Sequence, residues 1–311
     1  MNRTVAVVST GAIGASWAAH FLAEGWAVRA VDPAPGAEAA LRAQIEECRP
    51  ALRALGRPHA DGGGTLVWCD SIADAVAGAQ LVQENGPERV DVKRAIFAEI
   101  GAAAADDAVL ASSSSGIRAS DFQAAAGDRQ ARVLIGHPFN PPHLIPLVEV
   151  VGGAATDPDA VADALALYTA AGKRPVRLHR ELPGHVVNRL QAALWREAYA
   201  LVDSGAISVR DLDAAMEAGP GLRWALEGPF MTQHLSGGPG GIAHILEHLG
   251  PPTAEWWRDL SSVGELSEHM VAAIVDGMDD EVAGRDVAAI RARRDELLVA
   301  LLRLKSEGPR P

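Results

Sequence analysis

The 311-residue chain is longer than one hydrophobic core usually serves, so we expect two domains. It is 48% hydrophobic and 22% charged, which is typical of a folded globular protein and excludes a largely disordered one. Its net charge of −12 argues against nucleic acid as a partner. The sequence shows no signal-peptide pattern and no apolar run of membrane-spanning length, so we expect a cytoplasmic protein without membrane contacts.

Short runs rich in Val, Ile and Leu alternate with longer Ala-rich amphipathic stretches in the first part of the chain. This alternation is typical of βαβ units, in which helices join parallel strands. The predicted strands cover, in chain order, 4–9, 26–32, 65–68, 79–83, 108–112, 133–137, 145–151 and 175–178. The predicted helices between them cover 13–24, 36–55, 71–77, 90–104, 119–126 and 158–172.

Strand-like runs stop after Leu182-Pro183-Gly184. The remainder has the periodicity of helices, predicted at 185–204, 208–217, 223–235, 241–248, 254–277 and 283–305. We therefore predict a first α/β domain over 1–182 and an all-helical C-terminal domain over 183–311.

A glycine-rich turn, Ser9-Thr10-Gly11-Ala12-Ile13-Gly14, joins the first predicted strand to the first predicted helix. In a G-x-G-x-x-G turn at this place, backbone N–H groups and the helix N-terminus hold a pyrophosphate. Gly11 and Gly14 occupy the second and third glycine positions. Ser9 replaces the first, where a residue other than glycine is strained if φ is positive. A turn that binds another nucleotide, or none, is the alternative.

Asp32 ends the second predicted strand, where an acid accepts hydrogen bonds from the ribose of NAD and repels the 2′-phosphate of NADP. Together with the turn, it predicts a Rossmann-type, doubly wound, mostly parallel sheet that binds NAD. The predicted contacts are Ser9, Gly11, Ala12, Ile13, Gly14 and Asp32.

Two strand ends carry residues suited to catalysis. Ser112–Ser115 could be a flexible linker, but the run directly follows a predicted strand, and open α/β sheets bind ligands at such ends. His137 ends the next strand, and Glu149 follows on the returning strand. A histidine paired with a carboxylate is a suitable base for a hydroxyl proton as hydride leaves carbon.

Four segments resemble the 3-hydroxyacyl-CoA dehydrogenase family: Ser112–Gly116, Gly136–Pro141, Leu147–Val150 and Pro183–Arg189. The resemblance implies that His137 is the general base and Glu149 its partner. It also implies that Ser115 and Asn188 hydrogen-bond the substrate oxygen. Asn188 would then reach across from the opening of the second domain.

The same resemblance extends to the cofactor site and to the substrate. It implies that a segment with Glu84, Glu88 and Lys93 lines the nicotinamide-ribose side of the NAD site. Asn140, within a matching segment, is a candidate substrate contact. Helical second domains commonly dimerise in this family, so we expect a homodimer whose second domain serves substrate binding and dimerisation; the apolar 263–277 segment is either its interface or core.

Residues 219–238 resemble the branch of the family that includes L-gulonate 3-dehydrogenase, the lens λ-crystallins and carnitine dehydrogenase. Those substrates share a free carboxylate near the hydroxyl-bearing carbon, so Arg223 is a candidate carboxylate clamp, or simply a surface arginine. The predicted helix over 36–55, where the family contacts CoA, offers arginines but no lysine, so an acyl thioester stays open. Tryptophan faces for the quaternary ammonium of carnitine are available at Trp224, Trp256 and Trp257, unless these belong to the core.

Two further interpretations complete the prediction. His244-Ile245-Leu246-Glu247-His248 matches a zinc-peptidase pattern of low specificity, and no third ligand is evident downstream, so we predict no metal. The crystallin kinship raises the alternative of a non-catalytic NAD-binding or structural protein. Because Ser115, His137, Glu149 and Asn188 are all present, we favour an NAD-dependent dehydrogenase for a small 3-hydroxy acid or 3-hydroxyacyl thioester.

Overall fold

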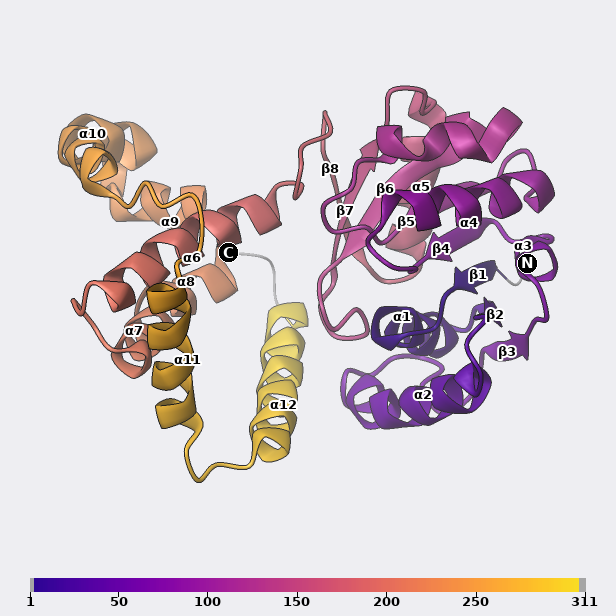
Figure 1. The fold of residues 1–311 in the computed structure, drawn as a ribbon, viewed down its shortest axis with the longest axis horizontal. Helices are drawn as coiled ribbons and strands as arrows, with labels where there is room; N and C mark the ends of the chain where they lie inside the picture. Colours follow the sequence, from indigo (N-terminus) through magenta and orange to yellow (C-terminus); the bar gives the residue numbers. More distant parts are fainter. Residues whose placement is uncertain (1–2, 308–311) are drawn as a thin grey trace. The chain divides into compact units, whose positions relative to one another are not determined.

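The computed structural model describes residues 3–307. The chain divides into two compact units, Met1–Arg189 and Leu190–Pro311 (Figure 1). The division lies slightly after residue 182, so the Pro183–Arg189 segment belongs to the first unit.

The first unit contains one eight-stranded sheet in the order β3-β2-β1-β4-β5-β6-β7-β8. All neighbouring strands are parallel except the antiparallel pair β6 and β7. The order reverses between β1 and β4, which makes this the predicted doubly wound sheet. The bounds are β1 (Thr4–Val8), β2 (Ala27–Val31), β3 (Thr65–Trp68), β4 (Leu81–Glu84), β5 (Val109–Ser112), β6 (Val133–Pro138), β7 (Leu147–Gly152) and β8 (Arg174–Arg177).

Helices cover both faces of this sheet, so its central strands are buried on both sides and consist of nearly continuous apolar runs. One core lies between the sheet and α1 (Ala12–Ala23), α2 (Ala37–Ala54) and α5 (Pro158–Ala170), with Trp17, Phe21 and Tyr168 at its centre. The other lies under α3 (Ile72–Val76) and α4 (Val90–Ala103). The predicted strands and the helices α1 to α5 are confirmed to within a few residues.

The predicted helix over 119–126 is wrong. The segment forms two 3₁₀ helices, η1 (Ala119–Asp121) and η2 (Gln123–Arg132). Phe122, between the two, has a φ of −136° and a ψ of −16°, which lie outside the α-helical range, so the stretch cannot form one α-helix.

All regular elements of the second unit, within its described residues, are helices. They are α6 (Val187–Asp203), which begins in the first unit, then α7 (Val209–Met216), a π-helical segment η3 (Glu217–Gly221), α8 (Leu222–Leu226), α9 (Pro229–Ser236), a 3₁₀ turn η4 (Gly238–Gly240), α10 (Gly241–Asp259), α11 (Glu268–Val282) and α12 (Val287–Ser306). Ser208, Ser267 and Asp286 accept hydrogen bonds from the first-turn backbone N–H groups of α7, α11 and α12, and so define where these helices begin.

Three predicted helices of this unit have different bounds. The predicted 223–235 helix is broken at Glu227, and Pro229 starts a new one. The predicted 241–248 helix continues through Pro251 and Pro252 to Asp259. The predicted 254–277 helix is interrupted over 260–267, where Ser267 caps a new helix.

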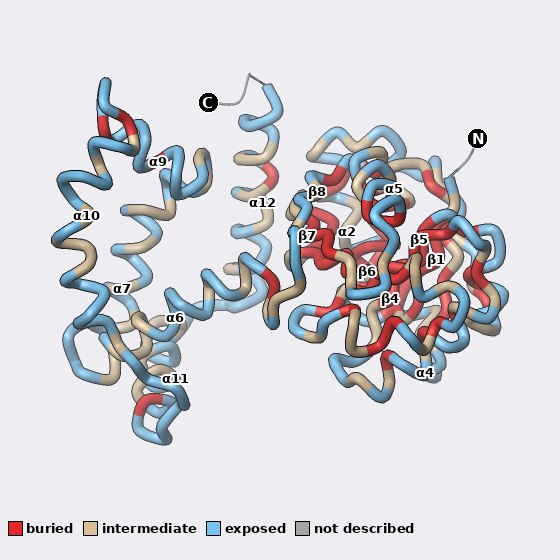
Figure 2. Tube along the Cα trace, turned by 90° about the horizontal axis from the view of Figure 1, so that it is seen from above, coloured by how far each residue is buried: buried red, intermediate tan, exposed pale blue. Residues whose placement is uncertain are grey.

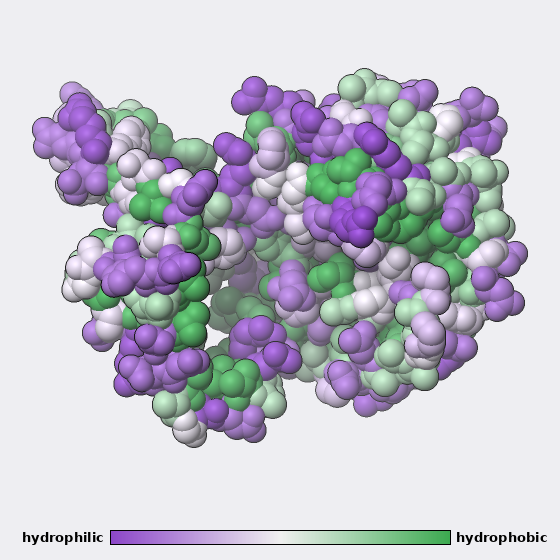
Figure 3. All heavy atoms as spheres, in the orientation of Figure 1, coloured by the Kyte–Doolittle hydropathy of each residue, from purple (hydrophilic) through white to green (hydrophobic). Residues whose placement is uncertain are grey.

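Burial differs sharply between the units (Figure 2). Among the described residues, Met270 and Val299 are the only buried hydrophobic side chains of the second unit. Large apolar side chains such as Phe230, Trp257 and Leu304 are instead exposed by 75%, 68% and 66%. Figure 3 shows hydrophobic patches on this helical unit. Trp224 and Trp256 are exposed too, so the three tryptophans are not core residues of the single chain.

Candidate active site

The topology of the first unit brings the predicted catalytic residues to one edge of its sheet. β5 ends at Ser112 and β6 at Pro138, and these strands are parallel neighbours. β7 runs antiparallel to β6, and its Glu149 is the register partner of His137. The chain therefore places Ser115, His137 and Glu149 at the carboxyl ends of β5 and β6, where open α/β sheets bind ligands.

His137 and Glu149 form a buried pair. His137 Nδ1 lies 3.0 Å from Glu149 Oε2, with 4% of His137 and 0% of Glu149 exposed. Glu149 Oε1 accepts two backbone hydrogen bonds, from Val186 N and Val187 N, each at 3.0 Å. A carboxylate accepts from Nδ1–H, so the other ring nitrogen, Nε2, keeps a lone pair that can take a proton.

Glu149 is held in its ionised form. Its burial alone would raise the pKa of the carboxyl group, but the hydrogen bonds from His137, Val187 and Val186 outweigh that effect and bring the pKa below its ordinary value. Glu149 therefore faces His137 Nδ1 as a negative charge.

The four-serine run is an ordered part of the site rather than a linker. The hydroxyls of its first three members donate to side-chain oxygens nearby: Ser112 Oγ to Glu84 Oε2 at 2.5 Å, Ser113 Oγ to Asn85 Oδ1 at 2.7 Å and Ser114 Oγ to Glu88 Oε1 at 2.7 Å. Ser115 is exposed. It is therefore the serine of the four whose side chain is available to a ligand.

Asn188 joins the same edge from within the first unit. Its Nδ2 donates to the backbone oxygen of Ser115 at 3.3 Å. By its contacts Asn188 groups with the first unit, because the chain after Pro183-Gly184 packs against the end of β5 before α6 continues into the second unit. Its predicted role as a substrate contact from the second domain stays a prediction.

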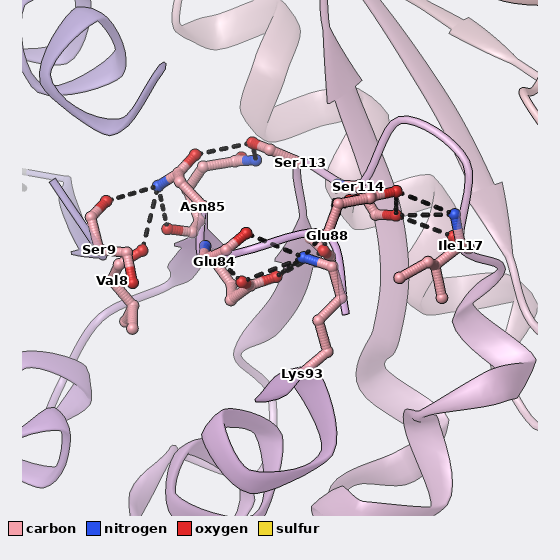
Figure 4. Close-up of polar contacts among 12 residues, drawn as sticks. Val8, Ser9, Glu84, Asn85, Glu88, Lys93, Ser113, Ser114 and Ile117 are labelled. Carbon is pink, nitrogen blue, oxygen red and sulfur yellow. Dashed lines mark hydrogen bonds and ion pairs between the residues drawn. The ribbon is translucent and has the colours of Figure 1, made fainter. Parts of the chain in front are cut away.

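A polar network lies beside the serines (Figure 4). Glu84 and Lys93 form an ion pair at 3.0 Å and are 0% and 1% exposed at the side chain. Neither can touch a cofactor directly, which corrects their predicted place on the surface of the NAD site. They hold the loop after β4 in place from the interior, since Glu84 Oε1 accepts from Gly86 N at 2.5 Å and Lys93 Nζ donates to Gly86 O at 3.4 Å.

Glu88, by contrast, stays 44% exposed at its side chain. It accepts hydrogen bonds from Ser114 Oγ, from Gly116 N at 2.8 Å and from Ile117 N at 3.1 Å. Burial would raise its pKa, yet these hydrogen bonds together hold the pKa below the ordinary value. Glu88 therefore anchors the loop after β5 as a carboxylate and still faces solvent.

The glycine turn has the geometry that a dinucleotide needs. A Cβ on Gly11 would meet nothing within 4 Å, so the backbone there is open to a ligand, whereas a Cβ on Gly14 would lie 2.1 Å from Ser9 O. Ser9 has a φ of 67°, the left-handed conformation foreseen for that corner. Asp32 Oδ2 accepts from Thr10 N at 2.7 Å and holds the turn against the end of β2.

The N-terminus of α1 carries no side-chain cap, and Gly11 and Ala12 are exposed. A helix end with uncapped N–H groups suits a pyrophosphate. The residues present therefore fit the dinucleotide, and Asp32, directly after β2, is partly exposed beside the turn.

Two further residues take part in the site, and Asn85 falls in the segment predicted to line its nicotinamide-ribose side. Asn85 Nδ2 donates to Val8 O at 3.2 Å and Ser9 O at 3.4 Å, and so ties the end of β4 to the glycine turn. His185 is buried against the end of β5, with its Nε2 2.9 Å from Ser114 O. His185 stood inside a matching segment, but only the folded chain brings it to that strand end.

The remaining candidates are exposed. Asn140 lies in the loop between β6 and β7, and Arg223 lies on α8 in the second unit; both are exposed. Within residues 3–307, Arg223 takes part in no ion pair. The rings of His244 and His248 lie side by side on α10, with centroids 4.0 Å apart and their planes tilted by 38°. Across the described part of the chain, no cluster of three or more possible metal ligands occurs.

Comparison with known protein families shows which family this chain belongs to. The family model for the 3-hydroxyacyl-CoA dehydrogenase NAD-binding domain matches residues 4–182, and that for the family's C-terminal domain matches residues 184–276. The chain belongs to the 3-hydroxyacyl-CoA dehydrogenase family. It is an NAD-dependent oxidoreductase that acts on the CH–OH group of a small 3-hydroxy substrate, as predicted. The non-catalytic alternative has no support.

Similar proteins cover nearly the whole chain. An L-carnitine dehydrogenase of Streptomyces coelicolor is 47% identical over 97% of this chain and 94% of its own. A 3-hydroxyacyl-CoA dehydrogenase of Gibberella moniliformis is 44% identical over 98% and 95%. Among solved structures, an NAD-dependent 5-formyl-3-hydroxy-2-methylpyridine 4-carboxylic acid 5-dehydrogenase is 31% identical, with a TM-score of 0.85 over 99% and 100% of the two chains. None of the helices described here combines the length and apolar character that crossing a bilayer requires.

Proposed function

We propose that this dehydrogenase oxidises the 3-hydroxyl group of L-carnitine. The observation that carries the proposal is the near-complete match to L-carnitine dehydrogenases, which are 40–47% identical in organisms as distant as Streptomyces and Pseudomonas putida. Bound NAD would supply the hydride acceptor. We place the enzyme in the cytoplasm, where that cofactor is abundant.

In the proposed reaction, His137 Nε2 takes the proton of the 3-hydroxyl group while the carbon that bears this hydroxyl group gives up a hydride to NAD. Glu149 stabilises the imidazolium through its bond to Nδ1, and Ser115 and Asn188 hydrogen-bond the substrate oxygen. The proton on His137 then passes to solvent. The buried pairing of His137 with an ionised Glu149 supports this assignment. The glycine turn, Asp32 and Glu88 are the proposed cofactor contacts.

A free acid fits this chain better than a CoA thioester. Each arginine on the outer face of α2 is already paired with a carboxylate: Arg42 with Glu38 at 2.8 Å, Arg49 with Glu46 at 2.5 Å, and Arg53 with Asp61. Few positive charges are left for CoA phosphates. We propose Arg223 as the clamp for the substrate carboxylate and an exposed tryptophan among Trp224, Trp256 and Trp257 as the face for the trimethylammonium group.

A substrate panel tests the proposal directly. With NAD in excess, we expect kcat/KM for L-carnitine to exceed that for 3-hydroxybutyrate by at least about 10-fold, because the latter lacks the cation that an aromatic face binds. The value for 3-hydroxybutyryl-CoA should be lower still. NADH formation by absorbance is the measurement, with D-carnitine as the stereochemical control. Preference for the thioester would overturn the carnitine assignment and leave the reaction class intact.

We also propose that a second copy of the chain covers apolar surface of the second unit. A helical unit with only Met270 and Val299 buried among its described hydrophobic residues lacks a core sufficient for stability on its own. Sedimentation equilibrium at micromolar concentration should give twice the 32.5 kDa mass of one chain. A monomer at that concentration would contradict the homodimer.

A further inference from the structure

His185 is a buried histidine that the proposed chemistry leaves without a role. It lies in the turn between β8 and α6, is 1% exposed, and adopts a left-handed φ of 51°. Its Nε2 lies 2.9 Å from Ser114 O. Because a carbonyl oxygen only accepts, Nε2 carries the proton and donates it.

The ring is held neutral. Burial lowers the pKa of His185, and this effect outweighs the hydrogen bond to Ser114, which acts in the opposite direction. In a neutral ring that donates from Nε2, Nδ1 is an acceptor; it is buried and has no hydrogen-bond partner among the described residues. The bond to Ser114 O is therefore the single polar anchor of this side chain.

The residues that follow His185 contact the proposed catalytic groups. Val186 N and Val187 N both donate to Glu149 Oε1 at 3.0 Å, and Asn188 Nδ2 donates to Ser115 O at 3.3 Å. The His185 ring itself lies 5.1 Å from the His137 ring, centroid to centroid. Segment 185–188 thus contacts the end of β5, Glu149 and His137 at once.

We propose that His185 is a positioning residue, which fastens segment 185–188 to the end of β5 and thereby holds Glu149 and Ser115 in place around His137. A non-glycine residue in the left-handed region is strained, and such strain persists only where surrounding contacts impose it. The backbone bond from His185 N to Leu182 O, at 3.0 Å, and the side-chain bond to Ser114 O are the contacts that impose it here. Without the bond to Ser114 O, the two amides that hold Glu149 are free to withdraw.

Two substitutions at His185 test this proposal, which rests on the proposed roles of His137, Glu149 and Ser115. His185→Phe keeps an aromatic ring and removes the N–H donor, whereas His185→Gln keeps an N–H donor of similar reach and removes the ring. We expect His185→Phe to lower kcat by about 10- to 100-fold, as a small misplacement of catalytic groups does, with the KM for NAD changed by less than about 2-fold. His185→Gln should recover kcat to within about 3-fold of the wild-type value.

The isotope effect separates positioning from a general loss of structure. With substrate deuterated at the hydroxyl-bearing carbon, the effect on kcat should rise in His185→Phe, because hydride transfer becomes slower than product release, and should fall back in His185→Gln. His179→Phe, at an exposed histidine of the same unit, is the matched control and should leave both quantities unchanged.

Two results would overturn the proposal: wild-type kcat in His185→Phe, or equal loss of kcat in the Phe and Gln variants, which would mean that an N–H donor at this position does not restore the positioning. His185→Asn provides a third arm if the Phe variant fails to fold, because asparagine tolerates a positive φ but its shorter amide reaches less far. We expect His185→Asn to lower kcat by about 10- to 100-fold, as for His185→Phe, and a wild-type kcat in this variant would contradict the proposal. Whichever hydroxy acid the wild-type enzyme oxidises serves as substrate, so a wrong carnitine assignment leaves the test intact. If His137→Ala abolishes turnover and His185→Phe does not, the positioning role alone fails.

Discussion

Replacing His137 by alanine is expected to lower kcat by about 100- to 10,000-fold, the range that positioned proton transfer contributes. The imidazole is the group of the site that combines a free basic nitrogen with an ionised partner, since Nδ1 is engaged by Glu149 at 3.0 Å. Steady-state kinetics with saturating NAD gives kcat. The Kd for NADH, from fluorescence titration, should change by less than about 2-fold, because the glycine turn lies at the end of β1 and is made by other residues.

The control for this variant is His179→Ala, which removes an exposed histidine of the same unit and should leave kcat unchanged. Wild-type turnover in His137→Ala would mean that another group takes the hydroxyl proton. A loss of NADH binding in step with kcat would instead point to a disturbed fold.

Replacing Lys93 by methionine is expected to lower the free energy of unfolding of the first unit by about 3–5 kcal/mol, because it leaves the Glu84 carboxylate buried without its cation. Both side chains are almost fully buried, at 1% and 0% exposure, so water cannot replace the lost partner. Urea unfolding followed by circular dichroism measures the change in the transition of this unit.

A second substitution isolates the charge. Lys93→Met combined with Glu84→Gln removes the buried charge. The amide oxygen can still accept from Gly86 N and the amide NH₂ can donate to Ser112 Oγ, so we expect this variant to recover more than half of the loss. Arg42→Met breaks an exposed ion pair with Glu38 and should cost less than about 1 kcal/mol. If Lys93→Met costs no more than Arg42→Met, the buried pair does not stabilise the fold as argued.

The strands of the first unit were predictable because each is a short apolar run buried on both faces. Val5–Val8 is the clearest case, with exposures of 0–2%. The helices of the second unit were less predictable. Pro251 and Pro252 look like a break, yet α10 continues through them, whereas the true break at 260–267 is set by the cap at Ser267. Helix periodicity alone does not reveal either choice.

The roles of single residues divide in the same way. Ser115, His137, Glu149 and Asn188 could be picked out from the sequence, because they lie near strand ends or within segments that match the family. The burial of Glu84 and Lys93 was not, because a pattern of charges gives no information on whether a charge finds its partner in the interior or in solvent. These two residues support the site from below instead of lining it.

The sequence by itself therefore determined the doubly wound sheet, the glycine turn for NAD and the order of the proposed catalytic residues, since each depends on neighbours along the chain. Only the tertiary structure decided that His185 bonds to Ser114, 71 residues away, and that the amides beside it hold Glu149. Such contacts depend on the path of the chain in space, where a left-handed turn at one residue decides which groups face the site.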